Sequence, residues 1–186
     1  MALTRLALVG VVALRRKVKE RHMATYAPAE PVTSLDQVRA IIPKEFSSQT
    51  GKIIDHIDDY VRVWIERSPF VTIGTHDRQG RADVAPKGDP AGFVKVLDAR
   101  RLLLPDVAGN KLFQSYGNLE TNPKAALLFL IPGCDWTVRV NGRTSVVEKS
   151  DGRLAGVDPE VFEHDDNTKI LQGILLEVDE AYAQCP

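Results

Sequence analysis

The chain of 186 residues carries a formal net charge of −1, with 44% hydrophobic and 26% charged residues. Such values are typical of a single globular domain, so they exclude disordered and fibrous proteins, and the balanced charge predicts neither a nucleic-acid nor a membrane partner. The two cysteines, Cys134 and Cys185, give no disulfide framework and no metal-ligand spacing, which favours a reducing compartment and predicts a cytoplasmic protein.

Residues 1–32 are predicted to be an N-terminal extension and residues 33–186 the folded domain. The extension holds an apolar run at residues 6–14 that is followed by basic residues. This run is shorter than the roughly 20 apolar residues that span a bilayer, and its order of charges differs from that of a signal peptide. Two interpretations remain open: residues 1–22 precede a natural start at Met23, or they form an amphipathic helix.

Two helices are expected ahead of the β-rich part of the chain. The run Thr33-Ser34-Leu35-Asp36 is typical of a helix start, because apolar residues follow it at helical spacing. A second helix is predicted from Asp58 to Arg67, and Ser68-Pro69 ends it, since proline disfavours helical geometry in the residue before it. Two further short helices are predicted at residues 111–120 and 159–163.

From residue 70 onward the sequence is dominated by short apolar or alternating runs that turn residues separate. The Asn141-Gly142 pair between two such runs is the strongest hairpin signal in the chain and predicts a tight turn. Eight candidate strands with only short helices between them favour a mainly β (α+β) fold, a closed antiparallel β-barrel flanked by short helices, over a parallel sheet. The predicted strands are residues 70–75, 82–86, 92–97, 101–105, 125–131, 136–140, 143–148 and 173–178.

The segment from Gly80 to Phe93 is a candidate ligand site. It follows a predicted strand through a turn and places Arg81 and Lys87 at the two ends of a short extended piece, with no acidic run opposite these cations. Turn-rich segments on a rigid β scaffold are common positions for binding chemistry. A solvated surface cation is the alternative interpretation for each of the two residues.

A second candidate segment is the loop between a predicted strand and a predicted helix. Asn110 and Lys111 stand where that helix is expected to begin, and the free N–H groups of a helix start, together with the Lys111 charge, suit a phosphate. Asn110 or Ser115 would add a further donor, although Asn110 as a plain helix cap remains an alternative. Thr137 and Arg139 share one face of a later strand. Together these residues predict a phosphate-bearing ligand in a β-barrel.

A set of motifs follows in order along the chain: Arg81-Ala-Asp-Val-Ala-Pro-Lys-Gly-Asp-Pro-Ala-Gly-Phe93, Leu103-Leu-Pro-Asp106, Gly109-Asn-Lys111, Asn122-Pro-Lys-Ala-Ala-Leu-Leu-Phe-Leu-Ile-Pro-Gly133 and Val138-Arg-Val-Asn-Gly142. In combination they resemble the pyridoxamine 5′-phosphate oxidase-related FMN-binding proteins, over a stretch from about Asp58 to Tyr182. This resemblance implies an antiparallel split β-barrel, in agreement with the strand pattern. It also implies a homodimer that binds FMN at the interface between its subunits.

The resemblance further implies roles for individual residues. It matches Leu104 and Pro105 to a pair that contacts the flavin through the backbone. It matches Asn110 and Lys111 to an Arg-Lys pair that holds the phosphate, so one of the two cations is an amide here. Thr137 stands where the second subunit of the family reaches the ring with a glutamine. One strand of the family lies along the flavin and ends in a lysine that contacts the phosphate or the ring. The resemblance matches this strand to Ala82, Asp83, Val84, Ala85, Pro86 and Lys87.

The function that the resemblance implies is an FMN-dependent oxidoreductase acting on a small molecule, in which Lys111 with Arg81 or Lys87 neutralises the phosphate. The basic C-terminal substrate site of true pyridoxamine-phosphate oxidases has no counterpart at residues 183–186, so FMN binding is implied without a defined reaction or catalytic residue. The alternative is a non-catalytic module that stores or senses flavin, haem or a deazaflavin, and His76 is the histidine near the candidate site. No metal site is expected, because the four histidines share no metal-ligand spacing.

Overall fold

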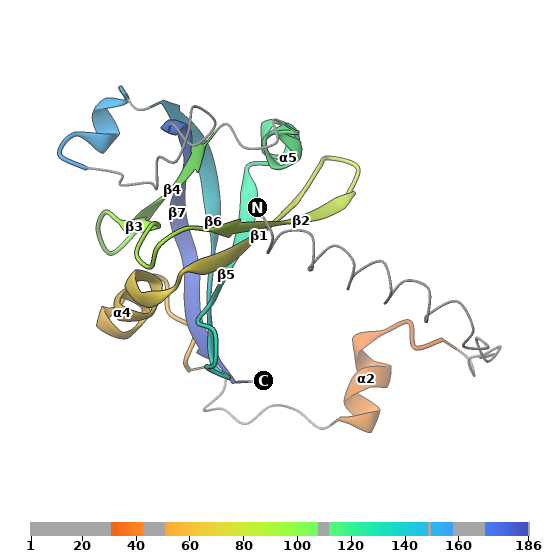
Figure 1. Cartoon of the computed structure of the whole chain (residues 1–186). Coiled ribbons are helices and arrows are strands. Elements are labelled where there is room, and N and C mark those ends of the chain that lie inside the picture. Colours follow the sequence, from red (N-terminus) through yellow and green to blue (C-terminus); the bar gives the residue numbers. More distant parts are fainter. Residues whose placement is uncertain (1–30, 43–50, 108–111, 149, 158–169, 186) are drawn as a thin grey trace, which may run out of the picture. The chain divides into compact units, whose positions relative to one another are not determined.

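The chain divides into two compact units, Met1–Lys44 and Glu45–Pro186. The domain boundary that the sequence predicts before residue 33 remains a prediction. Figure 1 draws in colour the residues that the computed structural model describes. They are residues 31–42, 51–107, 112–148, 150–157 and 170–185.

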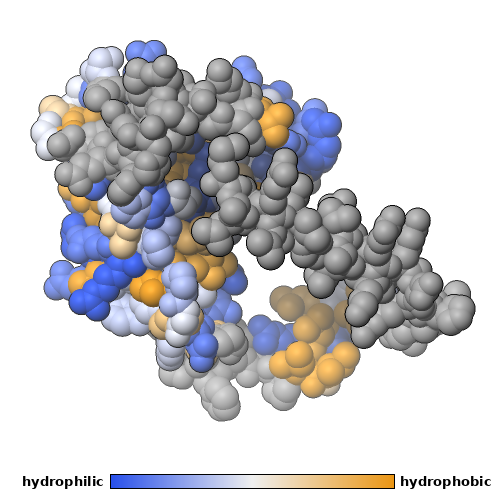
Figure 2. All heavy atoms as spheres, in the orientation of Figure 1, coloured by the Kyte–Doolittle hydropathy of each residue, from blue (hydrophilic) through white to orange (hydrophobic). Residues whose placement is uncertain are grey.

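In the first unit, helix α2 (Leu35–Ile41) begins where the sequence predicts a helix start. The Ser34 side chain accepts a hydrogen bond from the Gln37 N–H at 3.2 Å, and the Gln37 side chain accepts one from the Ser34 N–H at the same distance. This reciprocal arrangement is a capping box, which satisfies N–H groups that a helix start leaves free. The apolar side chains of α2 are exposed, with Leu35 at 68% and Ile41 at 72%, and they form an orange group in Figure 2.

The second unit is built on one antiparallel sheet that curls into a half-barrel (Figure 1). In the described part of this unit, seven strands are hydrogen-bonded in the order β2-β1-β5-β6-β7-β4-β3. The predicted antiparallel split β-barrel is confirmed. The closed ring of eight strands that the strand pattern predicts is not formed, because the described sheet has two edge strands, β2 and β3. The strands are β1 (Phe70–His76), β2 (Ala82–Gly88), β3 (Lys95–Val96), β4 (Arg101–Val107), β5 (Lys124–Leu130), β6 (Thr137–Glu148) and β7 (Ile170–Gln184).

The predicted hairpin at Asn141-Gly142 is wrong, because both residues lie inside the continuous strand β6. β6 pairs with β5 on one side and with β7 on the other, and its pairing with β7 shifts between Asn141 and Gly142, which marks a β-bulge. Glycine is needed there because a Cβ at Gly142 would overlap the carbonyl oxygen of Glu177 and lie 2.8 Å from Cδ2 of Leu176. The Asn-Gly pair therefore permits a close approach of two strands instead of a turn.

Helix α4 (Asp59–Arg67) confirms the second predicted helix. Its N-cap residue, Asp58, accepts a hydrogen bond from the Val61 N–H at 2.8 Å. The side chains of Val61 and Ile65 are buried in the main core, which lies on the inward face of the sheet. The spacing of these two residues places them on one face of the helix, so α4 covers the core with a single apolar stripe.

Helix α5 (Gln114–Thr121) begins later than predicted. Its N-cap residue, Phe113, has left-handed backbone angles, φ 50° and ψ 26°, and no side-chain hydrogen bond caps the helix there. A residue in this conformation cannot continue a right-handed helix, so the helix predicted at residues 111–120 does not run through Phe113. Asn110 and Lys111, like the helix predicted at residues 159–163, lie outside the described residues.

An ion pair links β2, at one edge of the curled sheet, to β4, which lies beside the other edge strand. Lys87 of β2 donates from Nζ to Oδ1 of Asp106 in β4 at 2.9 Å. β2 is the first strand in the order and β4 is the last but one. This contact between side chains therefore holds the curled sheet together where the two strands form no backbone hydrogen bonds. We call this ion pair the seam.

A smaller hydrophobic cluster lies on the opposite face of β4, β6 and β7. It is covered by the short 3₁₀ helix η2 (Gly152–Leu154), which Asp151 caps by accepting a hydrogen bond from the Arg153 N–H. The cluster keeps η2 against the sheet through buried apolar side chains. Its buried members are Leu103, Val147, Leu154 and Leu175.

Candidate functional site

Four strands carry a row of aligned residues on the outer face of the sheet, away from the main core. Val84 of β2 pairs with Gly74 of β1, and Gly74 pairs in turn with Ala126 of β5. Ala126 pairs with Asn141 of β6, and residues aligned in this way share one face of a sheet. A cavity of about 380 Å³ lies over the row and falls in the range of about 300–1,000 Å³ that small-molecule sites occupy. We call it the sheet pocket.

The sheet pocket has a floor of small residues. Gly74, Ala82 and Ala126 have no side-chain atoms beyond Cβ, so the backbone of β1, β2 and β5 is accessible from the pocket. A planar ring can lie against such a floor, and the free backbone groups of an edge strand can bond to its polar atoms. Of the predicted site residues, Ala82, Asp83 and Val84 line this pocket.

Asn141 brings an unsatisfied acceptor to the sheet pocket. Its Nδ2 donates to Oε1 of Glu180 at 2.6 Å, whereas its Oδ1 is buried and has no hydrogen-bond partner among the described residues. Leaving a buried acceptor unsatisfied costs about 1–3 kcal/mol. A ligand that offers an N–H group would remove this cost. Sequence reasoning missed Asn141 because its Asn-Gly pair was assigned to a turn.

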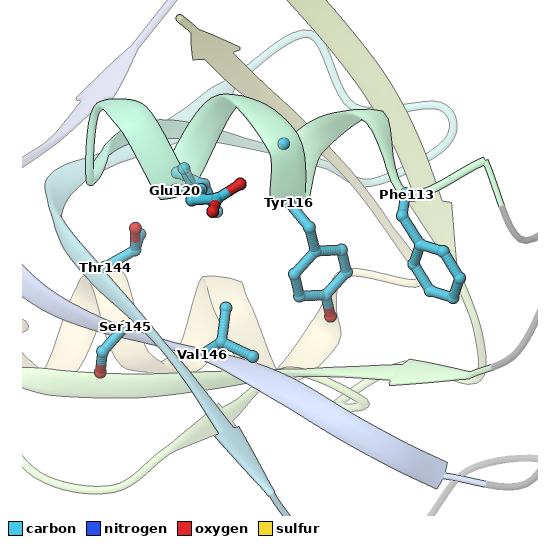
Figure 3. A pocket seen from close by; sticks show the side chains of 8 residues that line it. Phe113, Tyr116, Glu120, Thr144, Ser145 and Val146 are labelled. Atoms are coloured by element: carbon cyan, nitrogen blue, oxygen red, sulfur yellow. The ribbon is translucent and has the colours of Figure 1, made fainter.

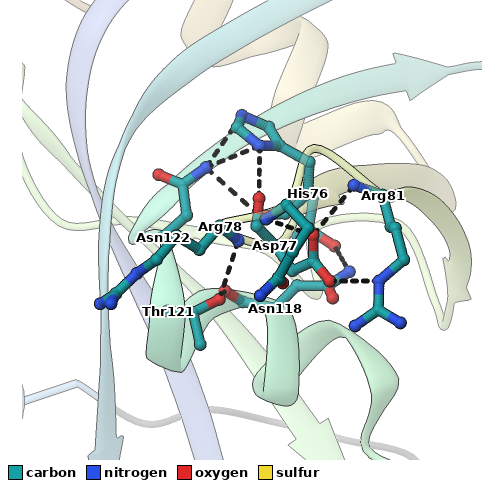
Figure 4. Close-up of polar contacts among 9 residues, drawn as sticks. His76, Asp77, Arg78, Arg81, Asn118, Thr121 and Asn122 are labelled. Carbon is teal, nitrogen blue, oxygen red and sulfur yellow. Dashed lines mark hydrogen bonds and ion pairs between the residues drawn. The ribbon is translucent and has the colours of Figure 1, made fainter.

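Two polar pairs stand at the rim of the sheet pocket. His76 is exposed at the end of β1, with its Nε2 2.8 Å from Nδ2 of Asn122 (Figure 4). On the neighbouring strand, Nζ of Lys124 lies 2.5 Å from Oδ2 of Asp179, and both side chains are about half exposed. Exposed pairs of this kind contribute little to stability, so a ligand can displace either pair at small cost.

Arg81 closes the turn between β1 and β2 (Figure 4). Its Nε donates to Oδ2 of Asp77 at 2.6 Å, and its backbone N–H donates to Oδ1 at 2.9 Å. The backbone N–H of Arg81, and then its guanidinium, hold the pKa of Asp77 below its ordinary value, against the opposing effect of burial. The Asp77 side chain is only 7% exposed, while that of Arg81 is 82% exposed. A single carboxylate thus balances the charge of Arg81.

Lys87 is likewise balanced by an acid. Its side chain is 25% exposed and that of Asp106, its partner in the seam, is 10% exposed. Leu104 and Pro105 directly precede Asp106, so the structure brings the predicted β2 and β4 segments together at the seam. The Leu104 side chain is buried in the main core, which leaves its backbone as the part that could meet a ligand. Between the sheet pocket and Lys87, the predicted residues Ala85–Pro86 are half-buried and exposed respectively.

The remaining predicted residues that the structure describes do not line the sheet pocket. Ser115 is buried in α5. Thr137 donates to the carbonyl of Gln184 at 3.2 Å, and the guanidinium of Arg139 lies 5.9 Å from the centre of the Tyr182 ring. Thr137 and Arg139 do share the outer face of β6, as their spacing predicts, because this strand alternates between a buried and an accessible face.

The described residues contain no group of three His, Cys, Asp or Glu side chains arranged to hold a metal ion. Within the same ranges, no helix is both long and apolar enough to cross a membrane. Cys134 and Cys185 are exposed free cysteines.

Fold and pocket together define a split-barrel protein with a cavity of small-molecule size on its outer face. The sequence matches the family model described as pyridoxamine 5′-phosphate oxidase over residues 57–170, which is more than half of the chain. The chain therefore belongs to the pyridoxamine 5′-phosphate oxidase family, and the resemblance seen in its motifs is confirmed.

Solved structures share the fold. HupZ of Group A Streptococcus gives a TM-score of 0.53 at 14% identity, over 69% of this chain and 94% of that one. A candidate pyridoxamine 5′-phosphate oxidase from Lactobacillus delbrueckii gives a TM-score of 0.51 at 21% identity, over 69% of this chain and 95% of that one. At these identities the likeness concerns the fold alone. No curated protein matches the chain.

Proposed function

We propose that the protein is an FMN-binding flavoprotein that acts as an oxidoreductase on a small molecule. The sheet pocket carries the proposal, because its small-residue floor and the unsatisfied Oδ1 of Asn141 suit a planar ring that bears an N–H group. Bound FMN would supply hydride transfer, while the protein supplies placement and electrostatics. The two free cysteines favour a reducing compartment, the cytoplasm, as the place of action.

The chain's own residues would hold the flavin through three kinds of contact. Ala82 and Val84 line the plane of the ring, and Asn141 accepts a hydrogen bond from its N–H group. Lys111, which lies outside the described residues, is the proposed phosphate contact. Lys87 is the proposed second cation, although Asp106 already balances its charge. Lys111→Ala is therefore expected to weaken FMN binding by about 1–3 kcal/mol, the value of one charged hydrogen bond.

The visible absorption spectrum of protein purified without added cofactor tests the proposal. The paired bands of oxidised flavin would support it, and a colourless protein that also fails to bind added FMN would overturn it. Turnover of a reduced nicotinamide nucleotide by the flavin-loaded protein then separates an oxidoreductase from a non-catalytic flavin module.

An FMN titration followed by flavin fluorescence tests the role of Asn141. Asn141→Leu is expected to weaken binding about 10-fold, because the loss of one hydrogen bond is worth about 1.4 kcal/mol. Ser145→Ala, on the same strand but outside the sheet pocket, is the control and should bind FMN as the unchanged protein does. Equal affinity of the two variants would remove Asn141 from the site.

We further propose that a second copy of the chain covers the outer face of the sheet, as the family resemblance implies. Two apolar side chains support this, since Val84 is 65% exposed and Phe70 is 37% exposed on that face. Val84→Glu should produce a monomer in sedimentation equilibrium and release FMN. Val63→Glu is the matched control, because Val63 is 43% exposed but lies on α4. A Val84→Glu monomer that retains FMN would contradict a site at the interface.

A haem-binding module is the second candidate, and one observation favours it. His76 lines the sheet pocket, and an imidazole is a common axial ligand of haem iron. Titration with hemin should then give a Soret band that His76→Ala abolishes. A Soret band that survives in His76→Ala, or its absence from the unchanged protein, would reject this candidate.

A further inference from the structure

A second cavity lies between α5 and the C-terminal half of β6. Its volume is about 600 Å³, and it shares no lining residue with the sheet pocket within the described part of the chain. Figure 3 shows its walls: the side chains of Phe113, Tyr116 and Glu120 on the α5 side, and those of Thr144 and Val146 on β6. We call it the helix pocket. Its volume is in the range of small-molecule sites.

One wall of the helix pocket is aromatic. The rings of Phe113 and Tyr116 meet edge to face, with centroids 5.8 Å apart and planes at 70°. Phe113 is also the single non-glycine residue with positive φ among the described residues. Strained backbone of this kind persists where the surrounding structure holds it, and it is concentrated at ligand sites. Here it keeps an aromatic ring, 43% exposed, at the pocket instead of within the core.

The opposite wall presents a buried hydroxyl without a partner. Thr144 is only 7% exposed, yet its Oγ1 has no hydrogen-bond partner among the described residues. Its backbone N–H is already used, since it donates to the carbonyl of Pro123 at 2.8 Å. The neighbouring Ser145 differs, because its Oγ accepts a hydrogen bond from Nη1 of Arg153 at 3.1 Å. Thr144 therefore supplies the free polar group of this wall.

Among the described residues that line the helix pocket, Glu120 is the one charged side chain. In Figure 3 the Thr144 hydroxyl is directed toward the side of the hollow where Glu120 lies. A carboxylate accepts hydrogen bonds and repels anions. The apolar side chain of Val146, 47% exposed, completes a slot that combines flat apolar surface with hydrogen-bond acceptors. This combination selects against an anionic ligand.

We propose that the helix pocket binds a flat nitrogen heteroaromatic molecule that is uncharged or cationic and carries an N–H donor. The ring packs on Phe113 and Tyr116, and the N–H group donates to Oγ1 of Thr144. Glu120 excludes the corresponding carboxylate. Because the two pockets share no described lining residue, this assignment does not depend on a flavin being bound in the sheet pocket.

The test uses the full ¹⁵N-labelled chain and a matched pair of probes, nicotinamide and nicotinate, which differ only in an amide against a carboxylate. Nicotinamide should cause saturable amide shifts at Phe113, Gly117 and Thr144, and nicotinate should bind at least 10-fold more weakly. Thr144→Val should weaken nicotinamide binding at least 5-fold, whereas Ser145→Ala should not change it.

Each outcome decides the assignment. Thr144→Val removes a hydroxyl that has no partner among the described residues, so the variant should fold as well as the unchanged chain. No saturable shifts, shifts confined to the sheet pocket, or equal affinity of Thr144→Val and the unchanged protein would overturn the proposal. Equal binding of the two probes would equally overturn it, because Glu120 would then exert no selection.

Discussion

Gly142→Ala is expected to lower the stability of the protein more than any other single methyl group added to the sheet. The added Cβ would overlap the carbonyl oxygen of Glu177, lie 2.9 Å from its carbonyl carbon and lie 2.8 Å from Cδ2 of Leu176. The carbonyl belongs to β7, which is held by β6 on one side and β4 on the other, so it cannot retreat without breaking pairs. Overpacking typically costs about 1–3 kcal/mol, and because backbone must move here we expect about 3 kcal/mol or more.

Gly74→Ala is the matched control. Gly74 also lines the sheet pocket, but its Cβ would lie 3.7 Å from the carbonyl oxygen of Ala126, which is ordinary contact. Its effect should stay within about 1 kcal/mol, with a stabilising part because alanine restricts the unfolded chain. Urea unfolding followed by far-UV circular dichroism gives the midpoint and slope for both variants. A Gly142→Ala variant within about 1 kcal/mol of the unchanged protein would refute the reasoning.

Three further predictions concern carboxylates. Asp106→Asn removes the charge that balances Lys87 in the largely buried seam, so urea unfolding should show a loss of about 1–3 kcal/mol, and an unchanged midpoint would contradict a structural role. Asp77→Ala removes the acceptor of the turn between β1 and β2 and should lower the thermal midpoint by a few degrees, while an equal midpoint would show that the turn does not need it. The side-chain hydrogen bond from Arg153 lowers the pKa of Asp151 from 3.8 to about 2, so this carboxylate stabilises the fold above about pH 4 and loses that effect as the pH falls to about 2. The difference in thermal midpoint between the protein and Asp151→Asn should accordingly vanish near pH 2, and a difference that persists there would contradict the assignment.

Local patterns predicted most of the strands because each strand carries its own signals. The runs at residues 70–75 and 101–105 match the starts of β1 and β4, since alternation and flanking turn residues lie within one short window. The hairpin prediction at Asn141-Gly142 was wrong because its signal is not specific to one structure. The same dipeptide serves a hairpin and a bulge, and the pairing with β7, which no local window contains, decides between them.

The candidate site was predictable only in part, because its chemistry depends on pairs made by the fold. Asp77 lies four residues before Arg81, in a turn with a glycine, so that partner had a local signal. Asp106 lies 19 residues from Lys87 and reaches it only through the curl of the sheet. The free Oδ1 of Asn141 follows from packing across three strands and has no counterpart in sequence spacing.

The one-sided pairing of β2 gives the barrel a gradient of local stability. Among the described strands, β2 is hydrogen-bonded only to β1, with the seam and the packing of Ala85 on the core as further contacts, while β6 is bonded along both of its edges. Local opening follows the number of bonds and buried contacts that must break, so β2 is the strand expected to open first. A ligand that binds only the closed form stabilises that form by mass action. Loading of the sheet pocket should therefore appear as slowed amide exchange concentrated in β2, a signature that can be recorded without knowing the substrate.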